Sequence, residues 1–111
     1  MTVQEFIEKN NLEIISQGDL GQEITGCYIG DLLSLAMSRV EAGQVWMTVQ
    51  GNVNIAAVAA LTDPSCILLV EGRTADATAV QKAREQEVTV LKTDLPAYEA
   101  ACLLFEQNQC K

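Results

Sequence analysis

Histidine is absent from the sequence, which removes the usual base that activates serine or cysteine nucleophiles and excludes a phosphohistidine carrier. The four cysteines (Cys27, Cys66, Cys102 and Cys110) form no CxxC pair, so no zinc or iron–sulfur site is indicated, and we expect no metal and no cofactor. Cys66 and Cys102 lie in apolar segments and are expected in the core. Cys110 is the candidate exposed thiol, and whether it is redox-active stays open.

Basic residues are also scarce. The sequence has seven lysines and arginines and fifteen aspartates and glutamates, which gives a net charge of −8 at pH 7. No cluster of lysine and arginine is available to displace counterions from phosphates, so nucleic acid is not an expected partner. The first residues lack the basic and apolar regions of a secretory signal, and we expect a cytoplasmic protein.

Residues 42–62 (AGQVWMTVQGNVNIAAVAALT) contain no ionisable side chain. A transmembrane span is rejected, because Gln44, Gln50 and Asn54 lie within the run and Gly51 would sit at its middle. Residues 44–49 are β-branched and aromatic like a buried strand, residues 50–52 read as a tight turn, and residues 53–61 are apolar at helical length.

The rest of the chain alternates strands with helices. We expect helices at 2–10, 32–40, 77–86 and 97–107, strands at 12–15, 24–29, 66–70 and 88–91, and Asp31 as the N-cap of the second helix. Such an order predicts an α/β fold with a mostly parallel sheet of four or five strands and helices on its faces. The strand at 12–15 is the candidate antiparallel edge, and residues 1–111 form one domain.

The helix at 53–61 is apolar on every side except Asn54, and one sheet face cannot bury all of it. Its second contact is either a neighbouring helix or another copy of the chain. We hypothesise a homodimer packed through this helix and the preceding one. The interface residues expected for it are Leu32, Leu35, Ala56, Ala57 and Ala60.

Polar residues follow four strands, and in a parallel sheet these loops share one edge. A cleft there would suit a small polar ligand or the hydrogen-bonding edge of a nucleotide. The candidate ligand-binding residues are Asp31, Gln50, Gly51, Asn52, Asn54, Glu71, Gly72, Arg73 and Thr93. Asn54 is the strongest single candidate, because it is the lone polar residue of an apolar helix and a buried amide needs partners.

The same residues have plainer interpretations. Asp31, Asn52 and Thr93 or Asp94 could cap helices, Gln50 and Asn54 could hold loops in place, and Arg73 could be solvated. Trp46 could stack on a base, although a lone tryptophan in an apolar strand usually packs in the core. Asp31 and Glu71 could form a carboxylate pair, but no nucleophile or metal cluster accompanies them, so no enzyme activity is predicted.

Three segments, together with the order of elements, resemble the DRTGG domain, a regulatory α/β module of bacteria and archaea. They are residues 30–34 (GDLLS), 46–55 (WMTVQGNVNI) and 67–72 (ILLVEG). The resemblance spans residues 12–104 and implies a fold similar to the N-terminal domain of HPr kinase. It also implies a regulatory role, because the module accompanies phosphotransacetylase domains or nucleotide-sensing CBS pairs elsewhere; this chain resembles a stand-alone version.

The sequence departs from the motif for which that family is named. At the Gly-Asp-Arg turn this chain has Gly51, Asn52 and Val53, and at the Thr-Gly-Gly turn it has Val70, Glu71 and Gly72. Only the two glycines carry over, as turn residues. No GxxxxGK[ST] loop occurs, so phosphoryl transfer is not indicated.

Two functions remain open from the sequence. The first is a non-catalytic regulatory module that dimerises, binds a metabolite or nucleotide at the sheet edge and signals to a separate partner. The second is a purely structural dimerisation or interaction module with no ligand.

Overall fold

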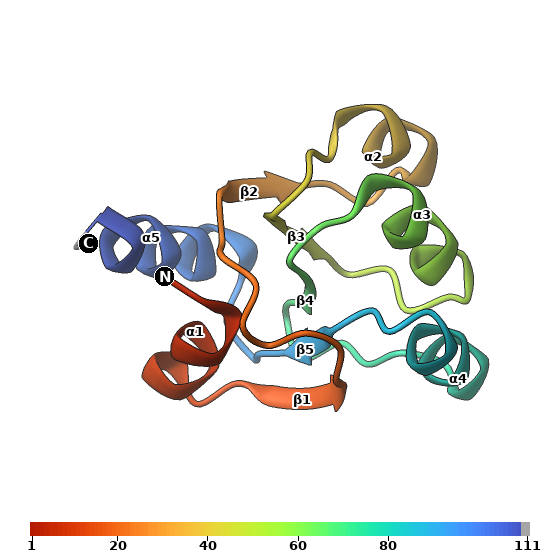
Figure 1. Ribbon diagram of the computed structural model, residues 1–111, viewed down its shortest axis with the longest axis horizontal. Coiled ribbons are helices and arrows are strands. Elements are labelled where there is room, and N and C mark those ends of the chain that lie inside the picture. Colours follow the sequence, from red (N-terminus) through yellow and green to blue (C-terminus); the bar gives the residue numbers. More distant parts are fainter. Residues whose placement is uncertain (110–111) are drawn as a thin grey trace.

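A computed structural model describes residues 1–109 and shows one five-stranded sheet between two helical layers (Figure 1). The strands are β1 (Glu13–Ser16), β2 (Gly26–Ile29), β3 (Gln44–Thr48), β4 (Cys66–Leu69) and β5 (Val90–Lys92). The helices are α1 (Val3–Asn10), α2 (Leu33–Arg39), α3 (Asn54–Thr62), α4 (Ala77–Glu85) and α5 (Ala97–Gln109). The predicted α/β fold is confirmed.

The strands lie in the order β1-β5-β4-β3-β2. All neighbouring pairs are parallel except β1 with β5, so the first strand is the antiparallel edge that the sequence suggested. Parallel neighbours require crossover helices, and α2, α3 and α4 supply them. The carboxyl ends of β2 to β5 therefore meet at one edge of the sheet.

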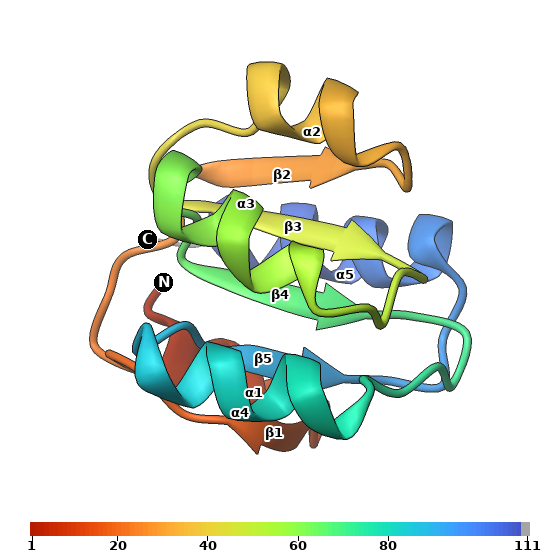
Figure 2. The ribbon, with the colours of Figure 1, turned by 90° about the vertical axis from the view of Figure 1, so that its right-hand side faces the viewer.

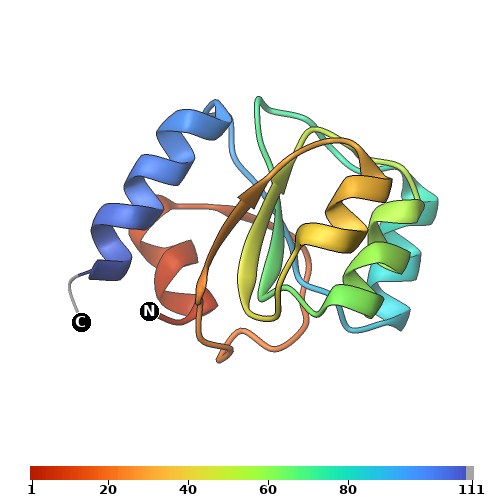
Figure 3. The same cartoon turned by 90° about the horizontal axis from the view of Figure 1, so that it is seen from above.

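The helices divide between the two faces of the sheet. Figure 3 shows α1 and α5 on one side and α2, α3 and α4 on the other, and Figure 2 shows these last three side by side in front of the strands. The sheet is buried from both sides, so residues of β3 alternate between two apolar clusters. Val45 and Met47 pack toward α1 and α5, whereas Trp46 packs toward α2 and α3.

Local signals account for both ends of α1. Helix α1 begins with a capping box in which Glu5 N–H donates to Thr2 Oγ1 (3.2 Å) and Thr2 N–H donates to Glu5 Oε1 (2.9 Å). The hydrogen bonds that the Glu5 carboxylate accepts from the Thr2 N–H and from the Thr2 hydroxyl lower the pKa of Glu5. Asn11 ends the helix in the left-handed conformation (φ 52°), which asparagine tolerates better than most residues.

Asp31 does not cap α2, so that prediction was wrong. Leu32 is the N-cap residue of α2 and has no side-chain capping bond. The carboxylate of Asp31 is instead used across the sheet edge, where it accepts hydrogen bonds from Thr48 and Val49 of the next strand and loop.

The second contact that α3 requires comes from its neighbours in the helical layer. Ile55, Ala56, Val58 and Ala59 are buried. The helix lies between α2 and α4 (Figure 2), so part of its apolar surface is covered within one chain, whereas Ala57, Ala60 and Leu61 stay exposed. Among residues 1–109, no helix is long and apolar enough to cross a membrane.

Candidate functional site at the carboxyl edge of the sheet

A groove of about 490 Å³ lies between the loop that follows β3 and the loop that follows β4. We call it the carboxyl-edge groove. It is lined by Val49, Gln50, Gly51, Asn52, Gly72, Arg73, Thr74 and Asp76. Five of the nine predicted ligand-binding residues therefore meet in it.

Asp31 fastens the loop after β3 to the start of α2. Its Oδ1 accepts from the Thr48 hydroxyl (2.8 Å) and from the Val49 N–H (2.9 Å). In return, Gln50 Nε2 donates to the backbone oxygen of Asp31 (3.1 Å), and Gln50 N–H donates to Thr48 Oγ1 (3.2 Å). The amide of Gln50 therefore holds loops together, as its plainer interpretation predicted.

Asn52 joins the same network to α3. Its Nδ2 donates to Gln50 Oε1 (3.1 Å), and its Oδ1 accepts from the backbone N–H of Asn54 (2.9 Å). A side chain that accepts from an N–H two residues later forms an Asx turn, which here precedes α3, whose N-cap residue is Val53. Asn54 itself is exposed, so the expectation of a buried amide was wrong.

Gly51 brings the two loops into direct contact. Its backbone oxygen accepts from the N–H of Asp76 (2.8 Å), the residue before α4. A Cβ at this position would lie 2.2 Å from the backbone oxygen of Thr74, a separation that real Cβ atoms do not show. Glycine is therefore required for the close approach of the loops, and the loop after β3 contacts the starts of α2, α3 and α4 together.

The loop after β4 is fixed from its other side by the segment that follows β5. Glu71 N–H donates to the backbone oxygen of Leu95 (2.9 Å), and Gly72 N–H donates to that of Thr93 (3.0 Å). Glu71 and Gly72 both have positive φ (61° and 69°). Thr93 itself lies outside the groove and lines a separate hollow with Lys92 and Asp94.

Arg73 is the cation of the groove. It is exposed, and within residues 1–109 its guanidinium has no hydrogen bond or ion pair. The structure agrees with the plainer interpretation, in which the side chain of Arg73 is solvated. Its five N–H donors are available to a ligand in the groove.

Trp46 belongs to the core and not to the site. It is fully buried, and its Nε1 donates to the backbone oxygen of Gly30 (3.0 Å), which satisfies its polar atom. The core interpretation of Trp46 is confirmed.

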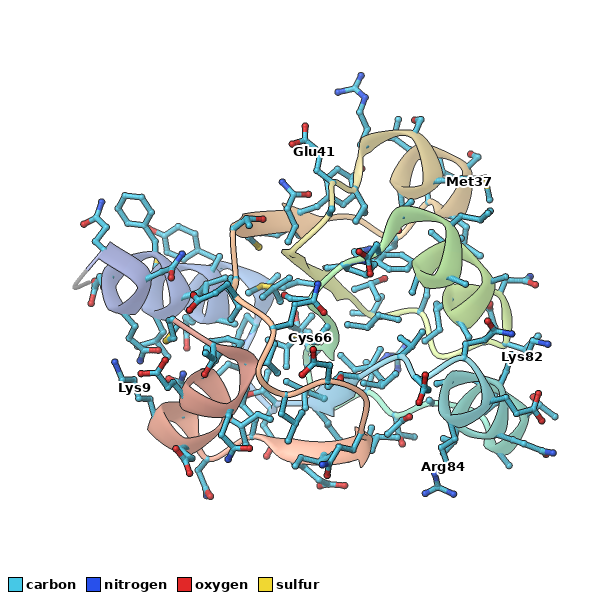
Figure 4. The ribbon with its side chains drawn as sticks, in the orientation of Figure 1. Lys9, Met37, Glu41, Cys66, Lys82 and Arg84 are labelled. Carbon is cyan, nitrogen blue, oxygen red and sulfur yellow. The ribbon has the colours of Figure 1, made fainter. Side chains whose placement is uncertain are left out.

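Two thiols are held in their neutral form. Burial raises the pKa of Cys27 to about 11 and that of Cys66 to about 12. Cys66, labelled near the middle of the view in Figure 4, is fully buried at the start of β4, as expected. Cys102 is only half-buried on α5, so its expected place in the core was wrong. Cys110 lies outside the described residues. No group of histidine, cysteine, aspartate and glutamate within residues 1–109 is arranged to hold a metal.

A second hollow, of about 660 Å³, lies at the opposite, amino edge of the sheet and was not predicted from the sequence. Gln17, Gly18, Asp63 and Glu87 are among the residues that line it, and none of its lining residues is basic. Asp63 and Glu87 both have positive φ (58°). We call it the amino-edge hollow.

Exposed apolar side chains gather on the helical layer that faces away from α1 and α5. We call this the α2–α3 face, and its members are Leu32, Leu35, Met37, Val53 and Leu61. Leu32 and Leu61 are the most exposed, at 65% and 73%, and Met37 projects outward from α2 (Figure 4). Of the predicted interface residues, Ala57 and Ala60 are exposed, but Ala56 is fully buried and offers no surface to a second copy.

Comparisons with known proteins bear on the fold. No protein-family model matches this sequence, and no curated protein matches it. Among solved structures, the chain is similar to the CBS and DRTGG domains of the regulatory region of Clostridium perfringens pyrophosphatase, which was determined with its activator, diadenosine tetraphosphate. The match has a TM-score of 0.72 at 13% sequence identity.

That match covers 93% of this chain and 45% of the other. This chain thus spans about half the length of the regulatory region to which it is similar. At such low identity the likeness shows the fold alone. It agrees with the resemblance to the DRTGG domain that the sequence indicated.

Proposed function

We propose that this chain is a non-catalytic regulatory module that binds a small metabolite or nucleotide in the carboxyl-edge groove, forms a homodimer and signals to a separate partner protein. The observation that carries this proposal is the set of hydrogen bonds made by the loop after β3. This loop lines the groove, and it is hydrogen-bonded to Asp31 before α2, to Asn54 at the start of α3 and to Asp76 before α4.

A ligand in the groove would thereby act on the helical layer. Gln50 and Asn52 line the groove and hold the starts of α2 and α3, so a ligand that changes their hydrogen bonds also changes how these helices sit on the sheet. A ligand shifts an equilibrium only by its differential affinity for two states. The proposal therefore requires two arrangements of α2 that bind the ligand unequally.

We assign the proposed homodimer contact to the α2–α3 face. Exposed Leu32 and Leu35 lie beside the site loops in sequence and structure, and Ala57 and Ala60 permit close approach of a second helix. Several large apolar side chains exposed on one helical layer favour an interaction site there.

The likeness in fold supports a regulatory role, because the similar structure is the regulatory region of a pyrophosphatase in complex with a nucleotide activator. The groove residues also favour a non-catalytic role. They include one guanidinium and one side-chain carboxylate but no thiol or imidazole.

A structural module without a ligand is the second candidate. It is favoured by the hydrogen bonds that Asp31, Gln50 and Asn52 already make with one another and with the backbone. In that case the network only fixes the loops.

Thermal-shift measurements with nucleotides and central metabolites separate the two candidates. A ligand at 100 times its dissociation constant stabilises the folded state by about 2.7 kcal/mol. Asn52→Ala in the groove should abolish the shift, whereas Gln86→Ala in the amino-edge hollow should preserve it. The absence of a shift with every compound would favour the structural module.

A further inference from the structure

The hydrogen-bonding groups of Gln50, Asn52 and Arg73 that remain free in the carboxyl-edge groove are mainly donors. The amide oxygens of Gln50 and Asn52 already accept hydrogen bonds, from Asn52 Nδ2 and Asn54 N–H. Gln50 Nε2 donates one hydrogen bond, to the backbone oxygen of Asp31, and Asn52 Nδ2 donates one, to Gln50 Oε1 (3.1 Å each), so each amide nitrogen retains a second N–H. The guanidinium of Arg73 adds five more donors in a planar fork.

The charge around these donors limits what they can bind. Arg73 is the only basic residue among the groove-lining residues, whereas Asp76 is an acid in the same lining. Glu71 precedes Gly72 and is exposed. The Oδ1 of Asp94 lies 3.1 Å from the position that a Cβ on Gly72 would take. The groove lining therefore holds one cation and one carboxylate, and the carboxylates of Glu71 and Asp94 belong to residues beside Gly72.

A polyphosphate is a poor match for this arrangement. Its first charge would be met by Arg73, but its further charges would find no second cation in the groove and would approach Asp76 and Glu71. Like charges at close range cost several kcal/mol across a binding interface. A single carboxylate is different, because it binds an arginine fork through two parallel hydrogen bonds and adds only one negative charge.

We propose that the carboxyl-edge groove binds a small metabolite with one carboxylate group, held by Arg73 and by the free amide N–H groups of Gln50 and Asn52, and that it excludes polyphosphates. This inference rests on the proposed function and names the ligand class of that same site. The groove volume of about 490 Å³ lies within the range of small-molecule sites, about 300–1,000 Å³.

Matched charge variants test the role of Arg73. Arg73→Gln and Arg84→Gln remove the same charge, but Arg84 lies on α4 and extends away from the body of the molecule (Figure 4). Arg73→Lys keeps the charge and loses the bidentate fork. Both positions are exposed, and the melting temperature of each variant without ligand checks that it is folded.

The probes are pyruvate, lactate and benzoate as monocarboxylates, and AMP, ATP and diadenosine tetraphosphate as phosphates, each titrated by calorimetry into the full chain. We expect at least one monocarboxylate to bind, with affinity reduced about tenfold or more in Arg73→Gln, reduced less in Arg73→Lys and unchanged in Arg84→Gln. Equal losses in the two glutamine variants would overturn the assignment to the groove.

The two proposals fail in different ways. Binding of a phosphate compound that depends on Arg73, with no binding of any monocarboxylate, would contradict the ligand class and leave the proposed function standing. Binding of none of the six compounds would contradict both.

Discussion

The hydrogen bond between Asp31 and Thr48 gives the sharpest prediction about stability. Asp31 lies before α2 and Thr48 ends β3, so the bond joins two elements across the edge of the sheet. Thr48 is 1% exposed. When Asp31 is changed to alanine, the Thr48 hydroxyl and the Val49 N–H both lose their acceptor.

The expected loss in the free energy of unfolding follows from the buried Thr48 hydroxyl. A buried donor without a partner costs about 1–3 kcal/mol, and Asp31 is itself exposed, so its charge adds little. We expect Asp31→Ala to lower the free energy of unfolding by about 2 kcal/mol, which corresponds to roughly 8 °C in melting temperature for a domain of this size. Asp76→Ala is the matched control, because it removes the same charge and Asp76 makes no side-chain capping bond.

A double-mutant cycle identifies the partner. Urea unfolding of Asp31→Ala, Thr48→Val and the double variant should give a coupling energy of about 1 kcal/mol, as expected for residues that share a hydrogen bond. If Asp31 acted as a cap of α2, the two effects would instead add to within about 0.3–0.5 kcal/mol. That additivity would refute the network.

Three further predictions follow from particular contacts. Gly51→Ala should destabilise the fold by about 1–3 kcal/mol in urea unfolding, because the added Cβ would clash with the Thr74 backbone. Gly26→Ala is the control and should be tolerated, because a Cβ there meets only side-chain atoms at 3.7 Å or more. Equal effects of the two substitutions would count against the tight loop contact. Burial raises the pKa of Cys27 to about 11 and of Cys66 to about 12, so the folded state favours the neutral thiols and its stability should decline as the pH rises from about 9 toward 12. The urea midpoint of the wild type should fall more over this window than that of a Cys27→Ala, Cys66→Ala variant. A wild-type midpoint that stays flat would contradict the buried thiols. Leu32→Glu with Leu35→Glu should convert a dimer to a 12.0 kDa monomer in light scattering, whereas Tyr98→Glu, at an exposed aromatic side chain on α5 outside this face, should not. A wild-type chain that is monomeric at micromolar concentration would contradict the dimer.

The sequence predicted the order of the elements because each signal was local. The apolar run of β4 and the β-branched residues of β3 act within a few positions of the chain. The antiparallel edge was also indicated, since β1 lies outside the regular alternation of strand and helix.

The missed features depend on contacts between distant segments. The partner of Asp31 lies 17 positions away, so a capping role was the nearest local explanation. Asn54 was expected to be buried because α3 is apolar on nearly every side, and such a helix gives no pattern from which to tell its inward face. The amino-edge hollow is formed by three loops, and no single loop shows it.

The central claim is that a ligand in the carboxyl-edge groove acts on α2 and α3, and amide chemical shifts of the labelled protein test it most directly. Titration with a compound that raises the melting temperature should first perturb the amides of residues 49–54 and 72–76. The perturbation should then extend to residues 31–35, through the bonds of Asp31 with the loop after β3. Shifts confined to the amino-edge hollow, or shifts in the groove that leave residues 31–35 unchanged, would contradict the account.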